Sequence, residues 1–467
     1  MAPRRPLARI VVAAGLVATL ATQGAPAFAQ SQGVSLIRDT EIEAIIHQDA
    51  DPILRAGGFE PKTVKILLIG SKDLNASAGP GVVTVNTGLI LESKNPNELQ
   101  GVLAHEVGHL VAGHSFRSGE MNKAGMTPFL LTMGLGVIAA LAGSGEAAAG
   151  LVGSAGYFGT LGAMGYSREQ ESRADQAGAR LLEQSQLSGK GLADFFDNFR
   201  YQEVFAEARR YAYFRTHPLS SDRIDALRAR VERQAYYDQK DTPEALDQHA
   251  IMRAKLDGFI NPQAAMMKYD EKDKSYPARY ARAIAYYQLK DSDRALKAID
   301  ALLVDQPDNP YLWELKGQVL FEFGRASEAE APQRRSVALM PQAPLLRINL
   351  GQTLIALDSP AKIDEGVAEL KKALTQEDDN AVAWRMLAEA YDKRGQGGMA
   401  RLATAEYNFA VGQTREALVF AMRARELLDK GTPEWRRATD IVLVSKPSKD
   451  DLKDLAREGS IAKGSFH

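Results

Sequence analysis

The 467-residue sequence contains no cysteine, and this absence excludes disulfides, thiolate metal sites and lipid-modified cysteines. The chain also lacks a strong excess of positive or negative charge. The net charge is only −2, so nothing in the composition suggests a nucleic-acid partner. Hydrophobic residues make up 45% and charged residues 25%, which is ordinary for a globular protein, and the length is enough for two or three domains.

Histidine is scarce as well, with seven in the chain, and two of the seven form the most informative motif. The segment His105 to His109 reads H-E-V-G-H. Positions four apart share one face of an α-helix, so both imidazoles can reach one metal ion. Glu106 is then close enough to take a proton from a water molecule on the metal. Zinc peptidases use this arrangement.

The flanking residues predict that this motif lies on a helix. Asn95 is a suitable N-cap, Pro96 suits the first helical position, and Glu98 follows three residues after the cap. An apolar stripe with helical spacing continues from there through Leu99, Val102, Leu103, Val107, Leu110 and Val111.

The third metal ligand decides the class of peptidase. A metzincin extension needs glycine at 112 and histidine at 115, and the chain has Ala112 and Ser115. His114 falls off the ligand face and is interpreted as a structural or supporting residue. A carboxylate on a later helix is the other solution.

Residues 166–175, YSREQESRAD, supply the best candidate carboxylates. Glu171 and Asp175 are four residues apart, so Glu171 can bind zinc while Asp175 accepts a hydrogen bond from a ligand histidine. The alternative is an ordinary solvated helix face, and the residues by themselves favour that alternative.

Further segments occur in a fixed order over about residues 40 to 230. They are Asn75-Ala76, Val85 to Leu89, His105 to His109, Ser167-Arg168 with Glu171, Ala174-Asp175, and Thr216-His217-Pro218 with Arg223. Together they resemble the HtpX/BepA type of gluzincin metallopeptidases, a group that also contains the CAAX prenyl proteases and the mitochondrial Oma-type enzymes. The resemblance implies one zinc per chain held by His105, His109 and Glu171, with Glu106 as the base and Asp175 supporting a ligand.

The resemblance gives His217 a divided role. In BepA-like relatives the matching histidine can approach the zinc and close the site, whereas in gluzincins generally a histidine near this place can donate to the oxyanion. Arg223 is the arginine that accompanies it and is expected to support the site electrostatically. Without the resemblance, Thr-His-Pro is more typical of a helix start after a turn.

A β-prone run, VVTV at 82–85, follows the turn residues GPG at 79–81. A strand placed before an active-site helix can pair its backbone with an extended peptide. The alternative is an ordinary core strand, and the resemblance favours the edge strand.

The N-terminus has the pattern of a targeting signal. Three arginines precede an apolar run over 10–20, and the small-x-small motif A-F-A ends at Ala29. We predict a signal peptide that is cleaved near Ala29 after general secretory export, which places the mature chain in a bacterial periplasm. The alternative is an N-terminal membrane anchor.

A second apolar stretch covers residues 126–142, and residues 143–165 are rich in glycine and alanine. Its length is close to that of a membrane span, but Pro128, Gly134 and Gly136 interrupt it. We predict a helical hairpin over 126–165 that is buried or contacts the membrane peripherally, and that forms a lid over the zinc cleft. A true span is the alternative.

Internal repeats organise the C-terminal part. Pro277, Pro310 and Pro344 are spaced 33 and 34 residues apart, and Gly317 and Gly351 are 34 apart. This is the tetratricopeptide period, in which each repeat is a pair of helices that stacks on the next. The repeats are predicted near 277–310, 311–344, 345–380 and 381–412, with a partial repeat over 408–428.

The predicted fold is therefore mainly α with a small β-sheet: a zinc-metallopeptidase domain followed by an α-solenoid of tetratricopeptide repeats. The predicted segments are a signal peptide at 1–29, the peptidase domain at 30–232, a helical connector at 233–276, the repeats at 277–430 and a polar, partly disordered tail at 431–467.

With the resemblance, this organisation predicts an exported zinc endopeptidase that hydrolyses misfolded or stalled envelope proteins. The repeats would recruit these substrates or a partner such as the outer-membrane assembly machinery. The alternative is a periplasmic chaperone or adaptor whose repeats carry the role and whose zinc site is largely silent. The complete set of ligands and base argues for retained chemistry.

Overall fold

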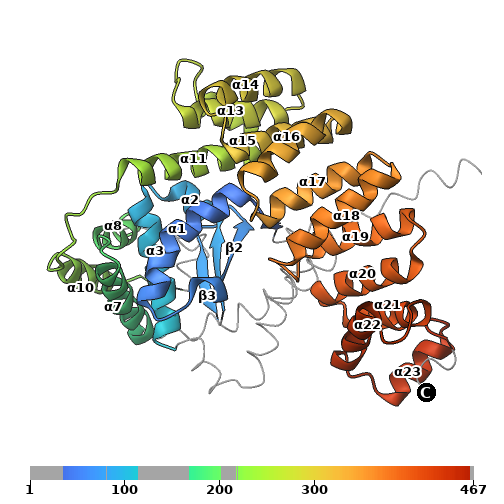
Figure 1. Cartoon of the computed structure of the whole chain (residues 1–467). Coiled ribbons are helices and arrows are strands. Elements are labelled where there is room, and N and C mark those ends of the chain that lie inside the picture. Colours follow the sequence, from blue (N-terminus) through green and yellow to red (C-terminus); the bar gives the residue numbers. More distant parts are fainter. Residues whose placement is uncertain (1–34, 80, 114–167, 201–216, 218, 463–467) are drawn as a thin grey trace, which may run out of the picture. The chain divides into compact units, whose positions relative to one another are not determined.

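The computed structural model describes residues 35–79, 81–113, 168–200, 217 and 219–462. Its N-terminal part is built around a four-stranded sheet with the strand order β1-β2-β4-β3. The sheet lies among the N-terminal helices (Figure 1). Strands β2 and β4 are parallel, and the two outer strands pair antiparallel with their neighbours. The strands are β1 (Ser35–Ile37), β2 (Lys65–Gly70), β3 (Ala76–Gly79) and β4 (Val82–Asn86).

The predicted strand over 82–85 is present as β4, but the prediction that it forms an edge was wrong. It lies between β2 and β3, and Val83 and Val85 are buried. The edge is β3, whose residues Ala76 to Gly79 pair with β4 on one side. Strand β3 also contacts the helix that carries the H-E-V-G-H motif, so the edge lies at that motif.

Helices pack against this sheet around one hydrophobic core. Those of the N-terminal part are α1 (Thr40–Ala56), α2 (Thr87–Glu92), α3 (Pro96–Val111), α7 (Arg168–Gln184), α8 (Lys190–Asp197) and α10 (Ser221–Val231). Helix α3 begins as predicted, because the Asn95 side chain accepts a hydrogen bond from the backbone N–H of Glu98 at 2.9 Å. The Glu98 carboxylate in turn accepts from the backbone N–H of Lys94, so both ends of this cap are satisfied.

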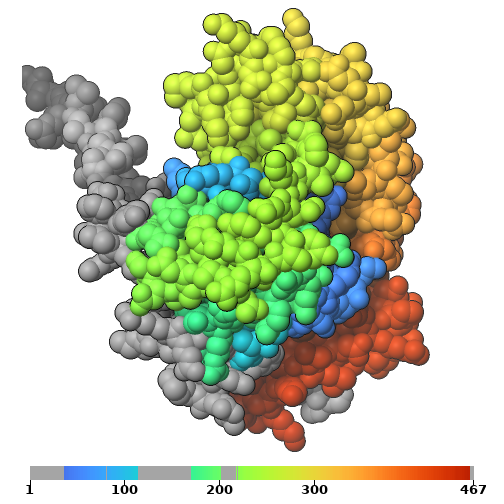
Figure 2. Space-filling model, turned by 90° about the vertical axis from the view of Figure 1, so that its left-hand side faces the viewer, coloured from blue at the N-terminus to red at the C-terminus, as the bar shows by residue number. Residues whose placement is uncertain are grey.

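A connector of two helices follows, α11 (Pro243–Ile260) and α12 (Pro262–Lys268). Helix α11 contacts α1, α2 and α3. In Figure 2 the yellow-green atoms, which include this connector, lie beside the green and blue atoms of the preceding elements. His249 and Arg253 of α11 donate to the carbonyls of Ser93 and Leu91 at 3.0 and 2.8 Å, which fastens the connector to the residues just before α3.

The remaining helices form successive antiparallel pairs, as the 34-residue period predicts (Figure 1). The pairs are α13 (Tyr276–Gln288) with α14 (Ser292–Asp305), α15 (Pro310–Glu322) with α16 (Ala326–Leu339), α17 (Pro344–Ala356) with α18 (Pro360–Leu374), and α19 (Ala381–Lys393) with α20 (Gly397–Ala410). The protein is therefore mainly α-helical, with a small sheet and a helical repeat array.

The end of the array is more ordered than the sequence suggested. Helix α21 (Thr414–Leu427) pairs with α22 (Pro433–Val444), and α23 (Lys449–Arg457) follows. Leu455 and Ile461 pack against Leu418 and Met422 of α21. The expected partial disorder of the tail was therefore wrong over the described residues up to 462.

Several predictions fall on residues that the structure does not describe. They are the signal peptide at 1–29, the hairpin at 126–165, and the roles of His114 and of the residues before His217. Within the described ranges, no helix is both long enough and apolar enough to cross a membrane.

A buried lysine of the connector lies where α1 of the N-terminal part meets α13, the first helix of the repeat array. Lys255 of α11 is 3% exposed, and its ammonium donates to Asp39 at 2.8 Å and to Glu41 at 3.0 Å. The Tyr280 hydroxyl of α13 also donates to Glu41, at 2.8 Å. We call these four residues the buried junction. Although burial by itself lowers the pKa of Lys255, the surrounding carboxylates, Asp39 first, raise it well above its usual value, so the ammonium is retained.

The Lys255→Met variant should be strongly destabilised. Removing one partner of a buried ion pair leaves the other charge uncompensated, which typically costs about 3–5 kcal/mol. A matched control is Lys297→Met, at an exposed position of α14, which should change little. Chemical denaturation of both variants would measure the difference. Equal unfolding midpoints would show that the buried junction contributes nothing to stability.

Candidate metal centre

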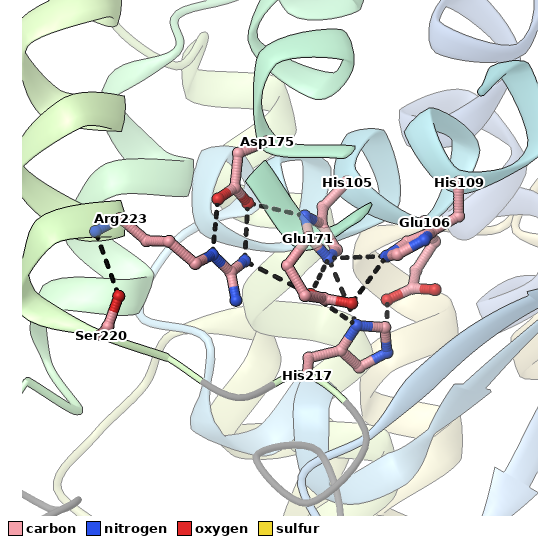
Figure 3. A network of polar contacts seen from close by, with 8 residues as sticks. All are labelled: His105, Glu106, His109, Glu171, Asp175, His217, Ser220 and Arg223. Carbon is pink, nitrogen blue, oxygen red and sulfur yellow. Dashed lines mark hydrogen bonds and ion pairs between the residues drawn. The ribbon is translucent and has the colours of Figure 1, made fainter. Parts of the chain in front are cut away.

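Helices α3 and α7 bring the predicted ligands together. His105, Glu106 and His109 project from α3, and Glu171 and Asp175 project from α7 (Figure 3). All five side chains are buried. The alternative of a solvated charged face for α7 is therefore excluded at these two carboxylates, because Glu171 is 0% exposed.

Four side chains offer ligand atoms that all lie within 4.8 Å of one another: His105, His109, Glu171 and His217. The Nε2 atoms of His105 and His109 are 3.1 Å apart. The Glu171 carboxylate lies 3.4 Å from His105 Nε2 and 3.5 Å from His109 Nε2. These separations are those of groups directed at one common point, as ligands of a single ion are.

The chemistry of this cluster fits a bound metal. Glu171 Oε1 and Glu106 Oε1 are buried, and neither accepts a hydrogen bond from any residue in the described part of the chain. Leaving a buried carboxylate oxygen unsatisfied is costly, and coordination or a bound water removes that cost. Two imidazoles and one carboxylate are also the donor set of many catalytic metal sites. His105, His109 and Glu171 would hold the metal.

The electrostatics of the cluster point the same way. Burial by itself lowers the pKa of His105, but contacts with Asp175 and Glu171 raise it to about 10. Burial by itself raises the pKa of Glu171, yet its contacts with His105 and His217 hold that pKa well below its usual range. The pocket therefore keeps a carboxylate ionised in the interior and favours positive charge beside it, which a metal cation would supply.

Asp175 and Arg223 support His105 from behind. His105 Nδ1 lies 2.9 Å from Asp175 Oδ1, within hydrogen-bonding distance. Arg223 donates to both oxygens of Asp175, at 2.9 Å each, and its guanidinium lies 3.3 Å from Glu171. This bidentate pair fixes the carboxylate, which orients the ring so that Nε2 faces the cluster.

The position of Arg223 follows from the start of α10. Ser220 is the N-cap of this helix and accepts a hydrogen bond from the backbone N–H of Arg223 at 3.4 Å. The described residue His217 lies three residues before this cap, and its Nδ1 is 3.1 Å from Glu171 Oε2. The start of α10 therefore positions Arg223, and His217 lies at the cluster against Glu171.

Two features of the pocket were not predicted. Phe196 of α8 packs edge-on against the His105 ring, with centroids 5.5 Å apart, and lies under the Arg223 guanidinium. The backbone N–H of Ala78 in β3 donates to the Glu106 carboxyl group. Burial is the larger influence and raises the pKa of Glu106, while His217, His105 and this N–H oppose it. No sequence signal marks Phe196, and a backbone donor leaves none.

Two glycines allow α3 and α7 to approach closely enough to build the cluster. A Cβ added at Gly108 would lie 2.6 Å from the Ala174 carbonyl oxygen, and one at Gly178 would lie 3.0 Å from the His105 backbone nitrogen. The close approach places the ligands of α3 opposite those of α7. The glycine inside H-E-V-G-H was a visible signal for this contact.

Gly108→Ala should weaken both the fold and the metal centre. The added methyl group meets backbone, which cannot move aside without separating the helices, and overpacking of this kind typically costs about 1–3 kcal/mol. Gly397→Ala is a matched control, because its Cβ would meet its nearest neighbour at 3.8 Å. Thermal unfolding and metal content measured on both variants would test this. A Gly108→Ala protein that equals the control in both would refute the packing argument.

Comparison with known proteins agrees with this geometry. Residues 37–231 match peptidase family M48, and residues 280–344 match the tetratricopeptide repeat family. The chain is 25% identical over 387 residues to the beta-barrel assembly-enhancing protease of Yersinia pestis, which covers 79% of this chain and 76% of that protein. The protein of the same name from Escherichia coli strain K12 is 23% identical over 384 residues, with the same two coverages.

A shorter relative matches a smaller share of the chain at higher identity. Metalloprotease LoiP of Escherichia coli strain K12 is 33% identical over 180 residues, which is 37% of this chain and 64% of that protein. The chain is thus a metalloprotease that joins a peptidase family M48 domain to tetratricopeptide repeats.

Proposed function

We propose that this metalloprotease is a zinc-dependent endopeptidase, exported to the periplasm, that cleaves misfolded or stalled envelope proteins. The observation that supports it most is the buried convergence of His105, His109 and Glu171 with Glu106 beside them. A single zinc per chain suits two imidazoles and a carboxylate. When bound, zinc supplies a Lewis acid that polarises the scissile carbonyl and lowers the pKa of water.

The chain's own residues carry the proton transfers. Glu106 follows His105 directly on α3, and its Oε1 accepts no hydrogen bond within the described residues. Its raised pKa, caused by burial, makes it a stronger base than an exposed glutamate. Glu106 would accept a proton from the attacking water and pass it to the leaving amine. Arg223 and Asp175 would keep the His105 ring in place throughout.

Strand β3 is the expected binding edge for the substrate backbone. The Asn75 carbonyl accepts a hydrogen bond from the Asn86 N–H, so alternate residues of β3 bond to β4. By the same alternation, the backbone groups of Ala76 and Ala78 face away from β4, and the Ala78 N–H reaches Glu106. A peptide added as a further strand along β3 would therefore pass the general base.

We propose that His217 restrains this site in the resting protein. Its Nδ1 lies 3.1 Å from Glu171 Oε2 and 3.4 Å from His105 Nε2, where a fourth ligand would be expected. Its Nε2 lies 3.5 Å from Glu106 Oε1, so the ring also lies beside the proposed base. These contacts favour closure of the metal site over the role of oxyanion donor.

His217→Ala separates the two roles by the sign of its effect. If the ring closes the site, the variant should show higher basal proteolysis and self-cleavage. An oxyanion donor predicts the opposite, a fall of roughly 10²–10³-fold. Cleavage of casein by the zinc-loaded variant would distinguish them. A folded, zinc-loaded and inactive variant would exclude closure.

The physiological role rests on the relatives and on the repeat array. The relatives' name, beta-barrel assembly-enhancing protease, suggests substrates among outer-membrane proteins, and stacked helical repeats provide an extended surface for protein partners. The decisive experiment compares cell envelopes that contain wild type or Glu106→Gln. Envelope proteins should accumulate in the variant. If none accumulates while the variant restores growth to a deletion strain, the repeats carry the role as a chaperone or adaptor.

A further inference from the structure

The peptidase part contacts the helices that follow it at two places. The first is the buried junction of Asp39, Glu41, Lys255 and Tyr280. The second is formed by two ion pairs, Arg38 with Glu377 and Lys65 with Asp379, which we call the outer pairs. Glu377 and Asp379 lie in the turn between α18 and α19, two repeats beyond the junction.

The buried junction is built to stay closed. Lys255 is 3% exposed, and its ammonium Nζ lies over the rings of Tyr280 and Tyr311, at 5.9 and 5.8 Å from their centroids. Glu314 of α15 lies close by and accepts a hydrogen bond from Asn349 of α17 at 2.9 Å. Opening this place would expose buried rings and separate charges that are paired in the interior.

The outer pairs are built differently. The side chains of Lys65 and Asp379 are 63% and 45% exposed, and those of Arg38 and Glu377 are 22% and 26% exposed. Exposed ion pairs add little to stability and are screened by salt. This rule applies directly to Lys65–Asp379, whereas Arg38–Glu377 is only partly exposed and makes two hydrogen bonds, at 2.7 and 3.2 Å. Both outer pairs are nevertheless more exposed than Lys255, so they hold the distal repeats less firmly than the junction holds the proximal repeats.

If the outer pairs separate, Arg38 and Glu377 each keep another polar contact. Arg38 donates to Glu43 of α1 at 2.7 Å as well as to Glu377. Glu377 accepts from the Asn380 side chain at 2.8 Å as well as from Arg38. Each partner thus has a second contact within its own part of the chain, which keeps the cost of separation low.

We propose that the repeat array hinges on the peptidase domain, with the buried junction as the pivot and the outer pairs as a latch that opens reversibly. The distal repeats then move away from the Arg38 and Lys65 side of the sheet while the first repeat stays attached. This inference does not depend on the chemistry of the metal centre.

The absence of cysteine allows a direct distance measurement. Thr63→Cys with Gln376→Cys places two spin labels at exposed, uncharged positions close in sequence to the outer pairs. Gln48→Cys with Ala301→Cys places a reference pair at exposed positions of α1, which contains the junction residue Glu41, and of α14, which follows the helix of Tyr280. Raising the salt from about 0.05 M to 1 M shortens the screening length to about 3 Å. The distances of the first pair should lengthen and broaden, and those of the reference pair should not.

A charge-neutral variant is the control for salt. Glu377→Gln with Asp379→Asn should reproduce the high-salt distances at low salt, because it removes the charges that the added salt screens. Unchanged distances at the latch in both salt and variant would show a rigid array. Equal changes at both label pairs would show detachment of the whole array. Either result would overturn the hinge.

Discussion

Glu106→Gln should lower peptide hydrolysis by about 10²–10⁴-fold, the usual cost of removing a general acid–base group. The amide has nearly the shape of the carboxylate but cannot accept the proton of the attacking water. The position is buried against the Ala78 N–H, and a glutamine oxygen can still accept that hydrogen bond. Fold and metal content should therefore stay those of wild type.

The measurement is hydrolysis of casein or an unfolded membrane protein by metal-loaded protein. The effect of Glu106→Gln should also be measured in the His217→Ala background. Removal of the proposed restraint raises the rate of hydrolysis there, so a loss of activity is easier to detect. Glu98→Gln is a matched control, since Glu98 lies on the same helix and caps its start without facing the cluster. Hydrolysis by Glu106→Gln at the rate of wild type would exclude Glu106 as the base.

Zinc binding should fail in His105→Ala and in Glu171→Ala. Each change removes one of the three proposed ligands, which belong to the cluster of four side chains that could hold a metal ion. Loss of a supporting partner of a ligand typically costs about 10–100-fold in metal affinity, so loss of a ligand should cost more, and Asp175→Asn should show the smaller effect. Metal analysis after dialysis against a weak chelator gives the three affinities in one experiment.

A histidine away from the cluster provides the control for these variants. His47 of α1 pairs with Asp51 at 3.1 Å, and His47→Ala should keep its zinc. Full zinc occupancy in both His105→Ala and Glu171→Ala would contradict the ligand assignment. Loss of zinc from His47→Ala as well would point to a general effect on folding.

The elements with strong local signals were predictable from the sequence. The start of α3 has an N-cap, a proline and a glutamate that act through neighbouring backbone groups, so the local sequence determines it. The helix pairs of the array were predictable because each repeat must bury the same face against the next, which imposes a constant period.

The role of Glu171 could not be read from its neighbours. Its segment is as polar as a solvated helix face. Only the burial of Glu171 between α3 and the start of α10 distinguishes a ligand-bearing face from a solvated one. That burial depends on Gly108 and Gly178, which lie far apart in the chain. The prediction that Glu171 is a metal ligand therefore came from the family resemblance and not from the local sequence.

The order of the strands and the end of the chain show the same limit. Residues 76–79, ASAG, are small and have weak β propensity, so the edge strand beside the metal motif was missed and its neighbour was assigned to the edge instead. In the polar tail, Leu452 and Leu455 are three residues apart and pack together against the preceding helices. Two apolar residues in a charged run are a weak signal until a partner surface covers them.

The most direct test of the metal centre is a titration of metal-free protein with zinc, following bound metal and peptide hydrolysis in the same sample. Wild type should gain hydrolysis in proportion to zinc and reach a plateau at one zinc per chain. Glu106→Gln should bind the same single zinc and stay inactive. Hydrolysis by wild type without metal, or a plateau that requires a second zinc, would contradict a single centre formed by His105, His109 and Glu171.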